Sequence, residues 1–487
     1  MSTDTGRDGA GARAAAGEPA GAAPESGGLR TGLTRRHMNL IALGGVIGAG
    51  LFVGSGVVIA KTGPAAVVAF LIAGGLTVVV MRMLAEMTVA RPAVGSFYVH
   101  VRESLGPRAG FVTGWLYWYF FVIVVAVEAV AGGRIIRLWL PGVPLWAVSL
   151  VLMVLLTATN MVSARSYGEF EYWFSSVKIA AIVVFLFLGG LYLSGAWPAG
   201  DAGGPGLAHL TGHGGFAPFG VAAVLAAVVP CIGFFTGAEI VTIAAAESEE
   251  PERAVASATR SIILRVVAFY VLSVLVVVAA VPWNSGAVQV SPYAAVLGRL
   301  GVPAVETVMN AVVLVAVLSC LNSALYTSSR MLFALTRNGD APRGFTRVGA
   351  SGVPRRALLA GTVLGFASTV AAWASPEGIF AFLINSYGAV ALFVYLLIGI
   401  AQVRMRRRLE REAPERLGLR MWGFPWLSYA AIAGMGAVLA AMAVLPDSRA
   451  QFWISTLTLA LVLGAYELRR RGGTGSRGVI SATPESR

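Results

Sequence analysis

The sequence predicts an all-α polytopic membrane protein with twelve transmembrane helices, and three observations carry this prediction. Of the 487 residues, 57% are hydrophobic, and the mean hydropathy of +0.75 lies far above that of soluble domains. The apolar residues gather in runs of about 20, the length of a helix that spans a bilayer. The arginines lie between these runs, as they do in loops that orient a membrane protein.

The apolar runs divide the chain into a tail, a core and a final pair of helices. The twelve expected spans lie at roughly 38–60, 64–90, 111–133, 145–163, 173–195, 218–246, 261–282, 303–329, 357–375, 378–402, 424–445 and 450–468. We expect a disordered cytoplasmic tail over 1–34, a ten-helix core over 35–402, a cytoplasmic Arg-rich loop over 403–423, helices eleven and twelve over 424–468, and a cytoplasmic tail over 469–487.

The distribution of arginine predicts which side each loop faces. Arg-rich segments precede span one, follow span ten and follow span twelve, whereas the opposite loops carry few cations. Because positively charged loops stay in the cytoplasm, both termini are expected there, with the protein in the plasma (inner) membrane. Orientation also explains the net charge of +13 better than nucleic-acid binding does. Cys231 and Cys320 lie in apolar runs, where packing is the expected role.

Span one contains the stretch Gly44–Gly50, which reads GGVIGAG. Each glycine inside a helix costs roughly 1 kcal/mol relative to alanine, so the helix is expected to break there. In lipid, a broken helix must direct its freed backbone groups at a cavity or at other protein. Transporters use such ends to hold the charged groups of a substrate. The alternative is that the glycines allow two helices to pack closely.

The break in span one would present its backbone to an amino acid. The N–H groups of Gly48, Ala49 and Gly50 begin the outer half-helix, and a helix N-terminus suits a carboxylate. The carbonyl groups of Val46 and Ile47 end the inner half-helix and suit an ammonium group. This half of the site would therefore bind a substrate mostly through backbone N–H and C=O groups.

Span six contains a second interruption, PCIGFFTGAE, over Pro230–Glu239. A proline and two glycines within this stretch predict a helix break near the middle of the span. Carbonyl groups from Gly233 to Thr236 would complete the ammonium site. Phe234 or Phe235 would cover the substrate, or both would pack in the core.

The two interruptions lie five spans apart and start on opposite sides of the membrane. This spacing predicts a 5+5 inverted repeat with discontinuous helices 1 and 6, plus two extra helices. The substrate site would lie between the two repeats, near the middle of the bilayer.

Two ionisable groups inside spans are candidates for proton coupling. Glu239 follows Gly237 in span six, where a carboxylate is costly and is a functional hypothesis by default. Its alternative role is a structural acid paired to backbone donors of the broken helix. Lys178 in span five either extends to the cytoplasmic interface or faces the bundle and changes protonation during transport.

Three further polar features lie within the expected spans. Two of them have a functional and a structural interpretation, and the third has a structural interpretation alone. Glu128 in span three serves the substrate amine or lines the outer vestibule. Asn322 belongs to a polar stripe on span eight that lines the cavity or bonds neighbouring helices. Arg82 and Glu86, spaced i, i+4 in span two, predict a structural ion pair.

The motifs together resemble the amino acid–polyamine–organocation (APC) superfamily, amino acid transporter branch, from about Arg35 to Arg470. Within that branch the likeness is closest to the bacterial γ-aminobutyrate (GABA) permeases. The matching stretches are GVIGAGLFVGSG (45–56), MRMLAEMTVA (81–90), GWLYWYF (114–120), YGEFEYWF (167–174), FFTGAEIVTIAAAES (234–248) and SCLNSALYTSSRMLFALTRNGDAP (319–342).

The resemblance implies proton-coupled uptake of an amino acid through the inverted-repeat fold. By motif match, residues 46–50 and 233–236 fall where the family binds the α-amino and carboxylate groups. Glu239 falls on the family's span-six acid, and Lys178 falls where some proton-coupled relatives keep a lysine in place of a sodium ion. The branch mixes substrates, so GABA is the best candidate and proline, aromatic or basic amino acids are alternatives.

No ATP-binding motif and no catalytic constellation is visible, so we expect a transporter rather than an enzyme. Its partners would be an amino acid, a proton and the lipid bilayer, with the proton gradient in place of any cofactor. His209 and His213 lie in a Gly-rich loop without a third ligand, so no metal site is expected. Obligatory exchange of amino acids and a sensor that binds without transport are the rival functions.

Overall fold

A computed structural model of the protein describes residues 47–48, 50–93, 95–197, 208–244, 269–349, 352–375 and 387–472, with the single residues 37, 40 and 383. Every regular element within these residues is a helix. The predicted tail over 1–34 and two of the predicted binding residues, Val46 and Ala49, lie outside the described part of the chain, as do 44 and 45 in the same stretch. So does 473–487, most of the predicted C-terminal tail.

The long helices form the body of the protein. They are α3 (Ala66–Ala90), α5 (Pro107–Ile136), α6 (Leu145–Val162), α7 (Ala164–Leu193), α15 (Val305–Arg337), α16 (Arg355–Ala374), α18 (Val390–Glu412), α19 (Trp426–Val444) and α20 (Pro446–Gly472).

Shorter helices complete the interrupted spans and the loops. They are η1 (Gly50–Gly54), α2 (Ser55–Thr62), η2 (Gly63–Ala65), α4 (Phe97–Leu105), α8 (Ala208–Thr211), α9 (Gly220–Phe235), α10 (Ile240–Ala244), α12 (Leu272–Ala280), α13 (Gly286–Val290), α14 (Pro292–Arg299), η5 (Arg343–Thr346) and η6 (Pro414–Arg416).

The protein is a polytopic membrane protein. Nine helical stretches in the described residues are long and apolar enough to cross a bilayer. The described part of span seven is the shorter α12, and α18 occupies span ten. A helix is thus recorded within each expected span, while the count of twelve and the inverted repeat stay predictions.

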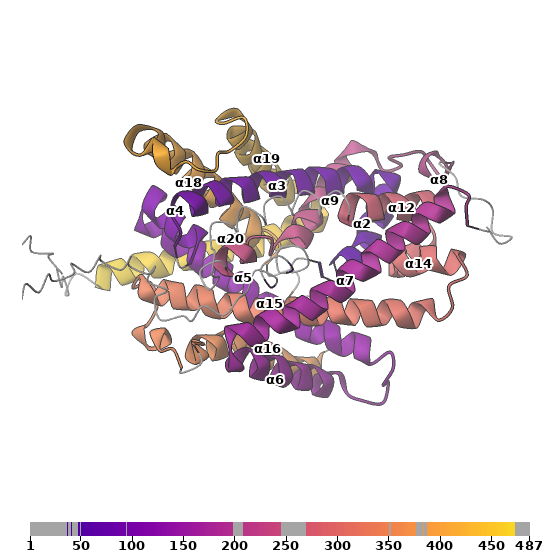
Figure 1. Ribbon diagram of the computed structural model, residues 1–487, viewed down its shortest axis with the longest axis horizontal. Coiled ribbons are helices and arrows are strands. Elements are labelled where there is room, and N and C mark those ends of the chain that lie inside the picture. The colour runs from indigo at the N-terminus through magenta and orange to yellow at the C-terminus, as the bar shows by residue number, and fades with distance from the viewer. Residues whose placement is uncertain are drawn as a thin grey trace, which may run out of the picture.

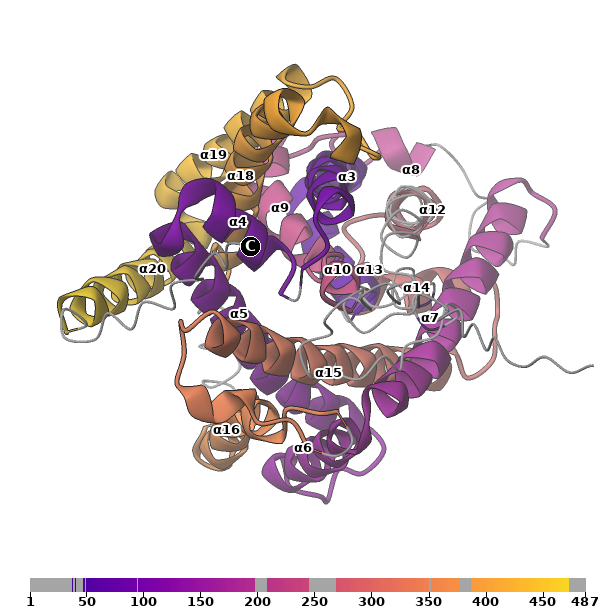
Figure 2. The same ribbon diagram turned by 60° about the vertical axis from the view of Figure 1, so that its left-hand side comes forward.

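The helices gather in groups around a common centre. In Figure 2, α5, α6, α15 and α16 form one group and α3, α9 and α12 another, and α2 packs against α9. α7 passes beside α15 (Figure 1), and Figure 2 shows α18, α19 and α20 on the side opposite α7. The two interrupted spans therefore face α5 and α15 across the middle of the protein.

Local signals in the sequence explain how several of these helices begin. The hydroxyl group of Ser163 accepts a hydrogen bond from the Ser166 N–H (3.0 Å) and caps the first turn of α7. α5 begins with Pro107, a residue suited to the first position of a helix. Gly106 before it has a φ of 98°, which allows the sharp turn from α4 into α5.

One boundary differs from the prediction. The expected Arg-rich loop starts at 403, but α18 continues as a helix to Glu412. Arginine and glutamate favour helix, and they pair at i, i+4 along this extension: Arg406 with Glu410 (2.8 Å) and Arg408 with Glu412 (2.7 Å).

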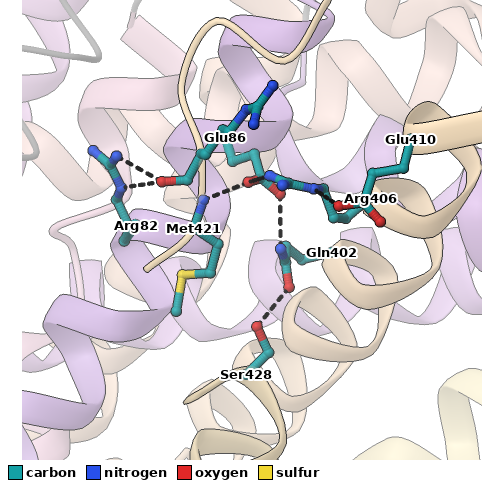
Figure 3. A network of polar contacts seen from close by, with 8 residues as sticks. Arg82, Glu86, Gln402, Arg406, Glu410, Met421 and Ser428 are labelled. Carbon is teal, nitrogen blue, oxygen red and sulfur yellow. Dashed lines mark hydrogen bonds and ion pairs between the residues drawn. The ribbon is translucent and has the colours of Figure 1, made fainter. Parts of the chain in front are cut away.

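The predicted ion pair within α3 is also replaced by a longer-range contact. Glu86 is buried, and its carboxylate accepts hydrogen bonds from Arg406 Nη1 (2.6 Å), Gln402 Nε2 (2.8 Å) and the Met421 N–H (2.5 Å), as Figure 3 shows. Arg82 instead donates to the backbone oxygen of Arg420. The segment after α18 thus folds back onto α3 and supplies the partners.

Candidate functional site

The first helix break has the expected place in the sequence. Ile47 and Gly48 are not helical, a short π-helical turn starts at Gly50, and regular α-helix resumes at Ser55. The Leu51 N–H donates to the Gly48 oxygen (3.3 Å). The first N–H groups of a helix have no carbonyl oxygen in a preceding turn to bond with. The N–H groups at the start of η1 are therefore suited to binding an anion.

The second break lies later in its span than the proline suggested. α9 continues through Pro230 and ends at Phe235. Thr236 is extended, Gly237 has a φ of 109°, and helix resumes with α10 at Ile240. A φ in this range is readily adopted only by glycine, so Gly237 rather than Pro230 determines where the helix breaks.

The two breaks approach each other through Phe234. A methyl group added to Gly50 would lie 2.5 Å from Phe234 Cδ1, and one added to Gly54 would lie 2.6 Å from its Cζ. The ring therefore fills the space that side chains at these glycines would occupy. Glycine in η1 serves this close approach as well as the interruption of the helix.

A cavity of about 360 Å³ lies between the breaks and α5. Backbone from both interrupted spans lines it, including the predicted residues Gly48, Gly50, Gly233 and Thr236. The walls are mostly apolar. A few polar side chains also face it, which is typical of a small-molecule site: they are Glu128, Ser323, Cys320 and Tyr387.

Ile47, Phe235 and Asn322 are not part of this cavity lining. Phe235 is buried against Phe70 and Tyr270, in the core, whereas Phe234 lines the cavity. Asn322 is buried between helices, where its side-chain oxygen accepts a hydrogen bond from Asn160 on α6 (2.8 Å). Of the two interpretations of Asn322, the contact matches helix–helix bonding.

Lys178 faces the bundle rather than the interface. Its side chain is completely buried, and Nζ donates to the hydroxyl group of Ser319 on α15 (2.8 Å). Nζ also lies 3.8 Å from Oε1 of Glu171, two turns earlier on α7. A buried ammonium group needs such a counter-charge, because taking an unpaired charge out of water is costly.

Glu171 is a central residue that sequence reasoning missed. It is fully buried, and its carboxylate accepts hydrogen bonds from Ser319 (2.7 Å), Ser175 (3.0 Å) and Ser323 (3.2 Å). The available signal was the spacing of seven residues from Lys178, which places both groups on one face of a helix.

Glu239 lies at the second break with a full set of donors. It accepts hydrogen bonds from Tyr117 (2.9 Å) on α5, Tyr395 (2.7 Å) on α18 and the Gly237 N–H (3.1 Å). The contact with Gly237 is the backbone pairing that its structural interpretation expected. Glu239 thus ties two other helices to the point where span six is interrupted.

Glu128 has the opposite environment. It lines the cavity, and its Oε2 atom is buried without a hydrogen-bond partner among the described residues. A buried polar atom normally has a partner, so this oxygen is open to a donor that enters the cavity. Among the described residues, no group of three or more His, Cys, Asp or Glu is arranged to hold a metal ion.

Comparison with known proteins places this site in a family. Residues 37–471 match the amino acid permease family. The γ-aminobutyric acid permease of Bacillus subtilis (strain 168) is 47% identical over 444 residues, covering 91% of this chain and 94% of the relative. The γ-aminobutyric acid permease of Escherichia coli (strain K12) is 46% identical over 434 residues, covering 89% and 92%.

A more distant relative carries a different substrate in its name. The aromatic amino acid transport protein of Corynebacterium glutamicum is 38% identical over 441 residues, covering 90% of this chain and 94% of the relative. The match over nearly the whole chain, together with the helical membrane fold, shows that this protein belongs to the amino acid permease family of membrane transporters.

Proposed function

We propose that this permease imports GABA across the plasma membrane together with a proton, with both termini in the cytoplasm. The proposal rests on one observation: Lys178 is buried with Ser319 and Glu171, beside a cavity that both helix breaks line. Relatives named as GABA permeases at 46–47% identity support the substrate. Because another relative is named for aromatic amino acids, a different amino acid is the alternative substrate.

The cavity offers separate places for the two charged ends of GABA. The N–H groups of Gly48 and Gly50 would suit the carboxylate, because a helix N-terminus attracts negative charge. The ammonium group would lie among carbonyl oxygens from 233–236 and near Oε2 of Glu128, which has no hydrogen-bond partner in the described part of the chain. Apolar walls between these ends would contact the methylene groups.

Lys178 is the proposed coupling group. A lysine can exist with or without its proton, and each form would favour a different arrangement of α7 and α15. Import would follow alternating access, in which one helix set moves against another around the cavity. The proton gradient would then drive accumulation without a cofactor.

Glu239 would assist coupling through the second break. Its ionised form accepts hydrogen bonds from two tyrosines and one backbone N–H. Protonation would turn one carboxylate oxygen into a donor and weaken this set. The joint between α9, α5 and α18 would loosen as a result.

The test is uptake of labelled GABA into substrate-free proteoliposomes with an imposed inward proton gradient. We expect uptake that the gradient stimulates and that unlabelled GABA suppresses more strongly than proline, phenylalanine or arginine. Stronger suppression by another amino acid would replace GABA as the substrate.

The rival functions give different outcomes in the same assay. Uptake that requires amino acid inside the vesicles would indicate obligatory exchange. Binding of GABA without flux would indicate a sensor. Uptake that ignores the proton gradient would contradict symport while leaving the substrate in place.

A further inference from the structure

Three buried side chains form a directed hydrogen-bond chain between α7 and α15. Lys178 Nζ donates to the Ser319 hydroxyl oxygen (2.8 Å), and the Ser319 hydroxyl donates to Glu171 Oε1 (2.7 Å). All three residues have no solvent-exposed surface. The chain therefore leads from an ammonium group, through one hydroxyl group, to a carboxylate.

Two further serine residues donate hydrogen bonds to Glu171 and keep its carboxylate oriented to accept a proton. Ser175 donates to Oε1 (3.0 Å) and Ser323 donates to Oε2 (3.2 Å), so both carboxylate oxygens act as acceptors. The direct distance from Nζ to Glu171 Oε1 is 3.8 Å, longer than a hydrogen bond. A proton that moves between Lys178 and Glu171 along hydrogen bonds in this cluster therefore passes through Ser319.

We propose that Ser319 relays the coupled proton from Lys178 to Glu171, an inference that rests on the proposed coupling role of Lys178. The Ser319 hydroxyl gives its own proton to the Glu171 carboxylate as its oxygen takes one from the Lys178 ammonium group. One N–H bond breaks, one O–H bond forms at Glu171, and Ser319 keeps a single proton. The products are a neutral amine and a neutral carboxylic acid, which later releases its proton to water.

The direction of the relay follows from the helix. Glu171 precedes Lys178 by seven residues, so its backbone lies roughly 10 Å nearer the N-terminal end of α7. The arginine distribution predicts that this end faces the cytoplasm. Transfer to Glu171 thus moves the proton toward the side where it has to leave.

Further ionisable groups surround the chain. The elements that carry it or pack against it hold several titratable or charged side chains, among them Tyr167 on α7, Glu128 on α5, Cys320, Tyr326 and Arg330 on α15, and Tyr293 on α14. Tyr167 and Tyr326 stack on each other, and Arg330 lies over the Tyr326 ring. Glu128 Oε2 forms no hydrogen bond with Lys178, Ser319 or Glu171.

The experiment compares two activities in proteoliposomes. Accumulation of labelled GABA driven by a proton gradient requires net proton movement, whereas GABA exchange without a gradient does not. Ser319→Ala and Glu171→Gln remove the relay hydroxyl and the proton acceptor. Ser319→Thr keeps a hydroxyl group. Ser176→Ala is the matched control, because Ser176 lies on α7 and donates to the Tyr172 oxygen outside the cluster (2.7 Å).

We expect the ratio of driven accumulation to exchange to fall about tenfold or more in Ser319→Ala and Glu171→Gln, since a positioned proton-transfer group contributes at least this much. Ser319→Thr should restore the ratio, and Ser176→Ala should match the unmodified protein. A pH-sensitive dye inside the vesicles should show the same loss of proton entry per GABA.

The relay is overturned if Ser319→Ala keeps the unmodified ratio, or if accumulation and exchange fall together in a protein that still elutes as a folded species. Failure of the proposed function looks different. In that case the unmodified protein itself shows no gradient-driven GABA uptake.

Discussion

Two buried acid–base clusters in this protein differ in their cation. At the end of α3, Glu86 binds Arg406 directly at 2.6 Å and also holds Gln402 and the backbone of Met421 (Figure 3). In the first half of α7, Glu171 faces Lys178 at 3.8 Å, with the Ser319 hydroxyl group bonded to both. Both acids are buried.

The difference indicates which cluster can change its charge. Arginine stays protonated in proteins, so the cluster around Glu86 is a fixed joint between α3, α18 and the following segment. Lysine can release its proton when its surroundings change. Among the 37 lysine and arginine residues, only Lys61 and Lys178 are lysines, and Lys178 is the one placed in this cluster.

We expect the largest effect when lysine and arginine are exchanged at positions 178 and 406. Lys178→Arg should abolish gradient-driven accumulation, because a guanidinium group cannot release the coupled proton. Arg406→Lys is the matched exchange at the fixed joint and should keep the proton dependence of uptake. Labelled GABA uptake with and without a proton gradient measures both. Normal accumulation by Lys178→Arg would place coupling elsewhere.

The fixed joint should matter mainly for stability. Glu86→Ala removes the buried carboxylate that Arg406, Gln402 and the Met421 N–H share, and leaves Arg406 its pair with the more exposed Glu410. We expect a cost of roughly 3 kcal/mol of unfolding free energy, at the lower end for breaking a buried pair. Thermal unfolding in detergent should show a clear decrease in melting temperature. Protein that remains folded should still respond to the proton gradient. A loss of coupling at unchanged stability would contradict the division between the two clusters.

His100 is buried without an ion partner among the described residues, and it gives a prediction for the effect of pH on stability. Burial on α4 and the nearby Arg91 lower the pKa of His100 to about 4. The unfolded chain takes up this proton near pH 6.5, so stability should fall as the pH drops from 6.5 toward 4, by about 3 kcal/mol at the lower end. Melting temperatures across this range measure it, and His100→Gln should reduce the slope. An identical slope in both proteins would contradict the prediction.

The smallest effect concerns the acid that faces the cavity. Glu128→Gln replaces a carboxyl group whose Oε2 has no hydrogen-bond partner among the described residues with an amide of the same shape, so folding should change little. The affinity for GABA should fall about tenfold, because a hydrogen bond to a charged group contributes about 1.5–3 kcal/mol. Competition by butyrate, which lacks the ammonium group, should change less. Equal losses for GABA and butyrate would remove Glu128 from ammonium recognition. Glu306→Gln, at an exposed position, is the control.

Several parts of the site were predictable because they depend on local chemistry. The glycines at 44–50 predicted the interruption in span one, and 47–48 are indeed not helical before η1 starts. The second break lies within the predicted stretch Pro230–Glu239, at its C-terminal end, since α9 continues through Pro230 and the turn needs Gly237. Local propensity marks a weak helix, while the exact break depends on what packs around it.

The sequence by itself determined the membrane class, the helix spans and the two glycine-rich interruptions, because hydropathy and backbone preference act over short stretches of chain. Only the tertiary structure decided the partners of the buried charges. Glu86 binds Arg406, 320 positions away, instead of its helical neighbour Arg82, and Lys178 meets Ser319 from another helix. A buried charge takes whatever donor or acceptor packing brings within reach, and that depends on how distant helices meet.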